Sequence, residues 1–190
     1  MGLFVVFEGP EGSGKTTQIR LLREALQLAG RDVLCTREPG GTAIGEQIRA
    51  VLHAVGNASM LPITEALLYS AARAQHVGEV IRPALSSGRF VVSDRYAYST
   101  LAYQGEGHGL DRAMLEQMTL WATGGLVPDL VVYLDLDVTE GLRRKQLAFD
   151  EGGEWNRMDQ LAVEFHRAVR TSYLRMAQAD AARWMVIDAG

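Results

Sequence analysis

A glycine-rich stretch near the start of the chain, "FEGPEGSGKTTQ" at residues 7–18, carries residue types that bind phosphate. Gly9, Gly14, Lys15 and Thr16 match the spacing G-x-x-x-x-G-K-[ST] between a strand-like apolar run and a helix-like pattern. Glycines let consecutive backbone N–H groups point at phosphate oxygens, and a helix N-terminus favours negative charge. The lysine of such a loop reaches the β- and γ-phosphates, and the hydroxyl ligates Mg²⁺. The sequence therefore predicts a loop for nucleotide phosphates, formed by Gly9, Pro10, Glu11, Gly12, Ser13, Gly14, Lys15 and Thr16.

Arginines follow two of the expected strands. Arg37 stands in "CTREPGGT" and Arg95 in "VVSDRYAYST", each at or just past the end of an apolar run. Ligands of open α/β sheets bind beyond the carboxyl ends of the strands, so both side chains should face the same crevice as Lys15. One arginine alone is as well explained by a surface salt bridge. Two on the same side favour a site for several phosphates and a phosphoryl group in transfer.

The phosphate loop by itself does not separate kinases, GTPases and ATP-driven machines. Guanine-specific switches read their base with an N-K-x-D segment, and no such tetrapeptide occurs in this chain. A kinase is therefore favoured over a GTPase. A kinase for another nucleotide or a nucleoside remains open at this point, as does an ATP-switched binding module that acts through a partner.

The elements that must position these residues alternate along the chain. Short runs rich in Val, Leu and Ile predict strands buried on both faces of a parallel sheet, and they are separated by helical patterns. Such βαβ units predict one α/β domain over residues 1–190, a three-layer sandwich with a five-stranded parallel sheet flanked by helices. The expected strands are 3–7, 32–36, 90–93, 130–134 and 184–187, and the expected helices are 15–29, 44–53, 62–86, 110–123, 138–147 and 160–179.

Composition excludes several other classes of protein. The chain has 190 residues and a formal net charge of -4, which gives no basic surface for nucleic acid. The single cysteine, Cys35, cannot form an internal disulfide, and no signal peptide or bilayer-spanning stretch is evident. We therefore expect a cytoplasmic protein with small-molecule substrates and no nucleic-acid or membrane partner.

Further motifs carry a resemblance to a known family. "TREPGGT", "YSAARAQHV", "SDRYAYSTLAYQG", "PDLVVYLDLDV", "NRMD" and the closing "VIDA" follow the phosphate loop in order. Together they resemble the thymidylate kinases of the bacterial type, over nearly the whole chain. The resemblance implies a P-loop nucleoside monophosphate kinase fold with a short lid at about residues 144–158. It also implies phosphorylation of dTMP to dTDP by ATP with Mg²⁺, and a homodimer, for which the apolar pattern of Ala66, Leu67, Val77, Val80 and Ile81 is a candidate face.

The resemblance assigns the substrate side of the site. Tyr69 and Arg73 would stack on thymine and bind its O4, and their spacing supports this because residues i and i+4 share a helix face. From the residues alone, a core tyrosine and a solvated arginine remain the alternative. Thr100 or Gln104 would meet N3 of the base, and Glu38–Pro39 falls at a common cis peptide. The full implied set is Glu11 for the 3′-hydroxyl, Arg37 and Arg95 for the phosphate, Tyr103 against a 2′-hydroxyl, and Pro39, Tyr69, Arg73, Ser99, Thr100 and Gln104.

The resemblance also assigns the metal and the catalytic cations. Mg²⁺ would be held by Thr16 with Asp94, or by Glu8 through water. The phosphate loop "GPEGSG" has no basic residue, so the transition-state arginine must come from the lid, which also carries the acids Asp150, Glu151 and Glu154. The chain ends at Gly190, where the resemblance leads us to expect a further helix. The expected catalytic residues are Lys15, Arg95, Arg143, Arg144 and Arg157.

Overall fold

One parallel sheet forms the centre of the protein. The computed structural model describes residues 2–153 and 155–190, and within them five strands lie in the order β2-β3-β1-β4-β5. Val5 of the central strand pairs with Val92 on one side and with Leu130 on the other. The predicted fold class and strand positions are therefore confirmed. The strands are β1 (Phe4–Glu8), β2 (Val33–Arg37), β3 (Phe90–Asp94), β4 (Leu130–Asp135) and β5 (Trp184–Asp188).

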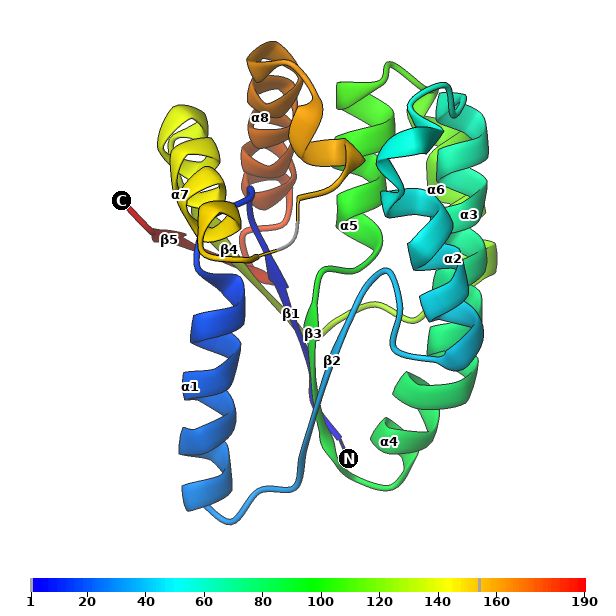
Figure 1. Cartoon of the computed structure of the whole chain (residues 1–190). Helices are drawn as coiled ribbons and strands as arrows, with labels where there is room; N and C mark the ends of the chain where they lie inside the picture. Colours follow the sequence, from blue (N-terminus) through cyan, green and yellow to red (C-terminus); the bar gives the residue numbers. More distant parts are fainter. Residues whose placement is uncertain (1, 154) are drawn as a thin grey trace.

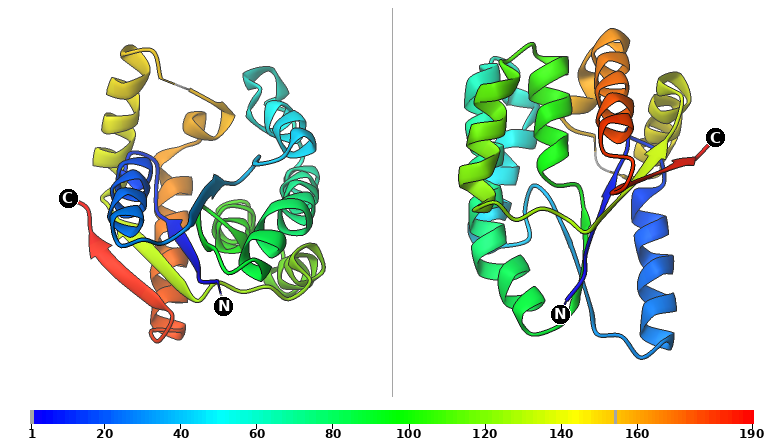
Figure 2. Two further views of the ribbon diagram at one scale, coloured as in Figure 1. Left: turned by 90° about the horizontal axis from the view of Figure 1, so that it is seen from below. Right: turned by 180° about the vertical axis from the view of Figure 1, so that it is seen from behind.

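Helices cover the two faces of this sheet unequally. Figure 1 shows α1 on one side, with α2 to α6 grouped on the other, and Figure 2 shows β5 and the C-terminus at one edge. In the described residues no helix has the length and apolar character needed to cross a membrane. The helices are α1 (Lys15–Leu28), α2 (Ala43–His53), η1 (Val55–Asn57), α3 (Pro62–His76), η2 (Val77–Ile81), α4 (Arg82–Ser86), α5 (Ala97–Thr100), η3 (Leu101–Gly107), α6 (Arg112–Thr123), α7 (Val138–Asp150), η4 (Arg157–Gln160) and α8 (Val163–Ala179).

The alternation of side chains along β1 explains the layers. Successive residues of a strand point to opposite faces, so Phe4 and Val6 face one layer while Val5 and Phe7 face the other. The first pair packs with buried side chains of η2 and α4, and the second pair packs with α1 through Ile19. Because both faces of β1 are buried, the end of this strand is a fixed platform for the phosphate loop that follows it.

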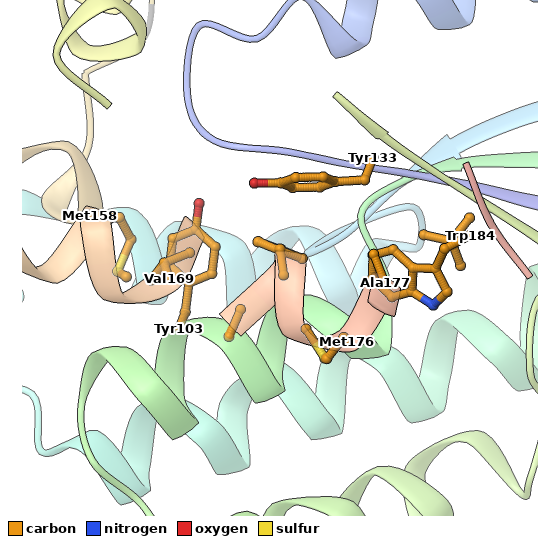
Figure 3. Close-up of a cluster of buried hydrophobic side chains, with 10 residues drawn as sticks. Tyr103, Tyr133, Met158, Val169, Met176, Ala177 and Trp184 are labelled. Carbon is orange, nitrogen blue, oxygen red and sulfur yellow. The ribbon is translucent and has the colours of Figure 1, made fainter. Parts of the chain in front are cut away.

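A third group of buried side chains joins α8 and η3 to β4 and β5. Tyr133 of β4 stacks on Tyr173 of α8 with ring centroids 5.1 Å apart, and Trp184 of β5 belongs to the same cluster. In Figure 3, Tyr103 and Met158 lie at one end of this cluster and Trp184 lies at the other. The core therefore fixes η3 and η4, the two segments that carry Tyr103 and Met158.

Several boundaries differ from the sequence prediction. The predicted helix 62–86 is three consecutive elements, because a π-helical turn, η2, separates α3 from α4. Residues 97–107 form α5 and the π-helix η3, which the sequence did not predict. The apolar face expected for dimerisation is also wrong in part, because Ala66, Val77 and Ile81 are buried in the core.

Candidate active site

The phosphate loop leads directly into the N-terminus of α1. Gly12 and Gly14 have φ angles of 73° and 86°, in the left-handed region that favours glycine. Gly14 is the N-cap of α1; no side chain caps this helix, and its first turn has no acidic residue. The positive end of the helix therefore remains open for an anion, as the motif predicts.

Lys15 lies inside the loop that precedes it. Its Nζ donates to the carbonyl oxygens of Gly9 and Pro10, at 3.1 and 2.9 Å. Burial lowers the pKa of the Lys15 ammonium. A side chain on Gly12 would collide with the carbonyl oxygen of Gly141, so α7 packs closely against this loop. The loop is thus held on both sides, by its own lysine and by the start of α7.

A cleft of about 360 Å³ opens beside the loop. All ten residues predicted to bind the substrate line it, and so do residues 11–16 of the phosphate loop and Asp94. Gly9, Pro10, Glu8, Arg143, Arg144 and Arg157 are not among its lining residues. The cleft therefore brings together the predicted phosphate, sugar and base contacts, but not the three arginines predicted for the lid.

Arg95 lines the cleft and has a strained backbone conformation. Among the described residues it is the one non-glycine residue with positive φ, 69°. Its Nη2 donates to Glu11 Oε1 at 2.6 Å, and its guanidinium lies 5.1 Å from the centroid of the Tyr103 ring. Burial alone would raise the pKa of Glu11, but the Arg95 charge outweighs it and lowers this pKa to about 2. Strain of this kind, about 1–3 kcal/mol, is typical of functional sites.

Arg37 approaches the cleft from the end of β2. One of its nitrogens, Nη2, donates to both carboxylate oxygens of Glu46 on α2, at 2.9 Å each. Glu46 also accepts from the backbone N–H of Gly41, in the turn after the cis Glu38–Pro39 peptide. This contact orients the arginine and leaves its Nε and Nη1 as donors for an anion.

The proposed metal ligands have different surroundings. Thr16 Oγ1 donates to Asp94 Oδ2 at 3.4 Å, so a hydroxyl and a carboxylate meet beside Lys15. Glu8 is fully buried, and its oxygens accept from the backbone N–H of Tyr96 and the hydroxyls of Ser99 and Tyr173. Burial raises the pKa of Glu8. Thr16 and Asp94 therefore offer two oxygens that could bind an ion, whereas Glu8 binds the backbone of the turn that carries Arg95.

Arg73 is one of the most deeply buried side chains of the protein. It is 1% exposed, and it donates to Glu38 Oε2 at 2.8 Å, Thr100 Oγ1 at 3.0 Å and the carbonyl oxygen of Tyr96 at 3.1 Å. These bonds use three of the five N–H groups of a guanidinium. The solvated alternative is therefore wrong, and donors remain for a substrate acceptor in the cleft.

The three arginines predicted for the lid have two kinds of environment. Arg143 and Arg144 both pair with Glu140 on α7; Arg143 is exposed, whereas Arg144 is half-buried and also donates to the carbonyl oxygen of Ala189 at 3.0 Å. Arg157 is 6% exposed, donates to the carbonyl oxygen of Leu52 and forms a buried ion pair with Glu65. Of the acids expected in the lid, Glu154 lies outside the described residues.

The structure adds cleft residues that the sequence analysis did not assign to the site. Lys145 lines the cleft, with its Nζ 3.5 Å from Asp159 Oδ2, and Arg49 and His53 of α2 line it as well. Lys145 belongs to the basic run "RRK", in which the sequence analysis assigned a catalytic role only to Arg143 and Arg144. Arg49 and His53 are four residues apart on one helix, which is the signal that a search for paired basic residues would have detected.

Comparisons with known proteins agree with this geometry. A family model described as thymidylate kinase matches residues 7–190. Curated thymidylate kinases from Roseiflexus sp. (strain RS-1) and Thermomicrobium roseum are each 51% identical, over alignments that cover 100% of this chain and 87% and 88% of those proteins. The chain belongs to the thymidylate kinase family. A crystal structure of thymidylate kinase from Ehrlichia chaffeensis superimposes with a TM-score of 0.78 at 32% identity, covering 98% of this chain and 92% of that one.

Membership of the family fixes the reaction class. The enzyme transfers the γ-phosphoryl group of ATP to dTMP, with Mg²⁺, which confirms the activity predicted from the sequence. The residues present fit both groups. The open N-terminus of α1 suits the ATP phosphates, and the oxygens of Thr16 and Asp94 are of the type that Mg²⁺ prefers.

Proposed function

We propose that dTMP lies in the cleft with its phosphate between Arg37 and Arg95 and its base against Tyr69 and Arg73. The observation that carries this proposal is the convergence of these four side chains with Lys15 on one cleft. Thr100 and Gln104 meet the N3 edge, Tyr103 and Ser99 border the sugar side, Pro39 closes the phosphate side, and Glu11 accepts from the 3′-hydroxyl. Catalysis then consists of positioning and charge neutralisation, without a covalent intermediate.

The phosphate loop binds the ATP phosphates through its backbone N–H groups and Lys15. Magnesium, when bound, neutralises charge on the phosphate oxygens, and Thr16 and Asp94 are its proposed protein ligands. Arg95 and Lys15 supply positive charge next to the transferred phosphoryl group, where negative charge develops in the transition state. Glu8 supports this arrangement by binding the backbone next to Arg95.

Among the lid cations, we propose Arg144, with Lys145 beside it, as the charge that closes over the transferred phosphoryl group. Arg144 lies against the phosphate loop, because a Cβ on Gly12 would be 3.1 Å from Arg144 Cβ. Arg157 is instead proposed to anchor the far end of the lid, since its guanidinium is buried against Glu65. Arg143 faces solvent at 61% exposure and would have the weaker effect of the two neighbours.

Substitution of the phosphate arginines tests the placement of dTMP. Arg37→Ala should raise KM for dTMP at least about tenfold and change KM for ATP little, because tenfold corresponds to about 1.4 kcal/mol, the scale of one charged hydrogen bond. Arg20→Ala is the matched control, because Arg20 is exposed and pairs with Glu24 on α1. Equal KM values for dTMP in both variants would remove Arg37 from the site.

We also infer a homodimer formed by a face on α3 and α6. Leu61 and Leu67 of the α3 region and Leu120 and Trp121 of α6 are 50–80% exposed, and α3 packs beside α6. Such a patch is typical of a contact surface. Trp121→Asp should convert the protein to monomers in analytical ultracentrifugation, and an unchanged mass would exclude this face.

We further propose that residues 1–190 form one P-loop domain with the lid at about 144–158, in a cytoplasmic protein. One continuous sheet, with buried clusters packed on both of its faces, supports a single domain. The glycines at 152 and 153, which follow the end of α7, support a lid hinged there. The absence of an internal disulfide partner for Cys35 supports the location. Cell fractionation and limited proteolysis at 150–153 test these two points.

A further inference from the structure

The side-chain amide of Gln104 has one hydrogen-bond donor end and one acceptor end. Gln104 lies on η3, is 2% exposed and lines the cleft. Whichever end faces the cleft decides which base edge this residue can read, because a ring N3–H needs an acceptor and an unprotonated N3 needs a donor. The orientation of this amide is therefore a determinant of substrate choice.

Glu65, on α3, contacts the donor end of that amide. Gln104 Nε2 donates to Glu65 Oε1 at 2.6 Å, and the same oxygen lies 3.3 Å from His108 Nε2. The other carboxylate oxygen, Oε2, accepts from Arg157. Glu65 itself is 1% exposed, so water does not compete for these contacts. Hydrogen bonds from Gln104 of η3 and Arg157 of η4 thus converge on one buried carboxylate, with the His108 ring close by.

These neighbouring side chains favour the ionised form of the Glu65 carboxylate. Burial alone would raise the pKa of Glu65, but the neighbouring His108, Arg157 and Gln104 side chains outweigh it and lower this pKa below the ordinary value. An ionised carboxylate accepts hydrogen bonds and donates none. A flipped Gln104 amide would place its carbonyl oxygen against Oε1 of Glu65, two acceptors at hydrogen-bond distance. Only the orientation with Nε2 toward Glu65 is therefore favourable.

The carbonyl oxygen of Gln104 is left without a protein donor among the described residues, on a side chain that lines the cleft. The orientation of Arg73 is fixed as well, because its guanidinium donates to Glu38, Thr100 and the carbonyl oxygen of Tyr96. Its remaining N–H groups are available to a ligand in the cleft. The base site thus offers a donor from Arg73 beside an acceptor from Gln104. Thymine presents the complementary pair, O4 and N3–H, whereas cytosine presents an amino group and an unprotonated N3.

We propose that Glu65 is a specificity-determining residue that acts through Gln104, fixing its carbonyl toward the base and so opposing cytosine nucleotides. This inference rests on the proposed position of the base against Arg73 and Gln104. Glu65 is a positioning residue, because it contacts Gln104 and not the substrate. Its removal leaves Gln104 free to rotate its amide, and a rotated amide donates to N3 of cytosine.

The experiment compares kcat/KM for dTMP and dCMP in wild type, Glu65→Gln and Gln104→Leu. A glutamine at 65 has nearly the same shape but offers a donor as well as an acceptor, so it no longer selects one orientation. We expect the ratio of dTMP to dCMP to fall at least about tenfold in both variants, since sites that read polar groups reject mismatches by far larger factors. Glu116→Gln is the matched control, because Glu116 is an exposed residue of α6 paired with Arg112.

The outcomes separate the role of Glu65 from the proposed position of the base. A purely structural role of Glu65 would lower both kcat/KM values by one factor and leave the ratio unchanged, which would overturn the inference. If the ratio falls in Gln104→Leu alone, the base site stands and the role of Glu65 is refuted. If neither variant changes it, the proposed base position fails as well. Should Glu65→Gln not fold, the double variant with Arg157→Met removes the buried charge together with its partner and gives the same readout.

Discussion

Replacement of Arg157 by alanine tests whether this residue is a structural anchor or a catalytic cation. In the structure Arg157 is 6% exposed and Glu65 is 1% exposed, and the guanidinium also donates to the carbonyl oxygen of Leu52 at 3.2 Å. Alanine would leave the Glu65 charge buried with only Gln104 and His108 as partners. It would also leave the Leu52 carbonyl without this donor. We therefore expect Arg157→Ala to reduce the stability of the fold more than the catalytic rate.

The magnitude follows from the burial of the pair. Removing one partner of a buried ion pair costs about 3–5 kcal/mol. For a chain of this size each kcal/mol shifts Tm by about 2–4 °C, so Arg157→Ala should lower Tm by about 6–20 °C. Urea unfolding, monitored by tryptophan fluorescence, would show the same loss of stability as a lower urea concentration at the midpoint. The kcat of the folded fraction, measured well below the new Tm, should fall by less than about tenfold.

Arg143→Ala is the matched control for this variant. Arg143 is 61% exposed and pairs with Glu140 three residues before it, so its removal should leave the urea midpoint unchanged. An Arg157→Ala protein with wild-type stability and a kcat reduced about a hundredfold or more would exclude the anchoring role. That result would mean that Arg157 leaves Glu65 and reaches the transferred phosphoryl group.

Three further predictions concern the phosphate loop and its neighbours. Lys15→Ala should fold normally and lose at least about 3 kcal/mol of transition-state stabilisation, and a kcat/KM above about a tenth of wild type would contradict its role. Arg144→Ala should lower kcat more than Arg143→Ala in steady-state assays, and equal effects confined to KM would place the transition-state cation elsewhere. Because Arg95 holds the pKa of Glu11 at about 2 instead of 4.5, the pair stabilises the fold in full above pH 4.5 and loses this contribution as pH falls toward 2. Glu11→Gln should therefore flatten the decrease of Tm across that range, and parallel Tm curves for the two proteins would contradict the assignment.

The phosphate loop and the strands were predictable because their signals are local. The spacing of Gly9, Gly14 and Lys15 defines a loop by itself, and β-branched runs such as that of β3 read as buried strands without knowledge of their neighbours. The residues at the strand ends then follow from the geometry of a parallel sheet, which is why Arg37 and Arg95 were assigned to one crevice.

The segment 97–107 was missed because tertiary contacts stabilise it. "AYSTLAYQGEG" contains two glycines and no clear helical period, yet Ala102 and Tyr103 are buried against α8, and Thr100 accepts from Arg73. Packing of this kind overrides local propensity. The segment nevertheless carries several of the proposed base contacts.

The environment of Arg157 could not be inferred from sequence for a related reason. Its partner Glu65 lies 92 positions away, and nothing in "NRMD" distinguishes a buried anchor from a mobile lid arginine. The same holds for Gln104 and Glu65, whose contact spans 39 positions. Pairings between distant helices depend on how the helices pack, and that is determined by the whole core.

The most direct measurement is nucleotide-dependent ADP release in a coupled assay, with ATP and Mg²⁺ and each nucleoside monophosphate in turn. We expect turnover with dTMP, weaker turnover with dUMP because a missing methyl costs about 1–3 kcal/mol, and very little with dCMP. Lys15→Ala should abolish the dTMP-dependent rate. ADP release that is indifferent to every monophosphate, or strongest with a nucleotide other than dTMP, would contradict the account.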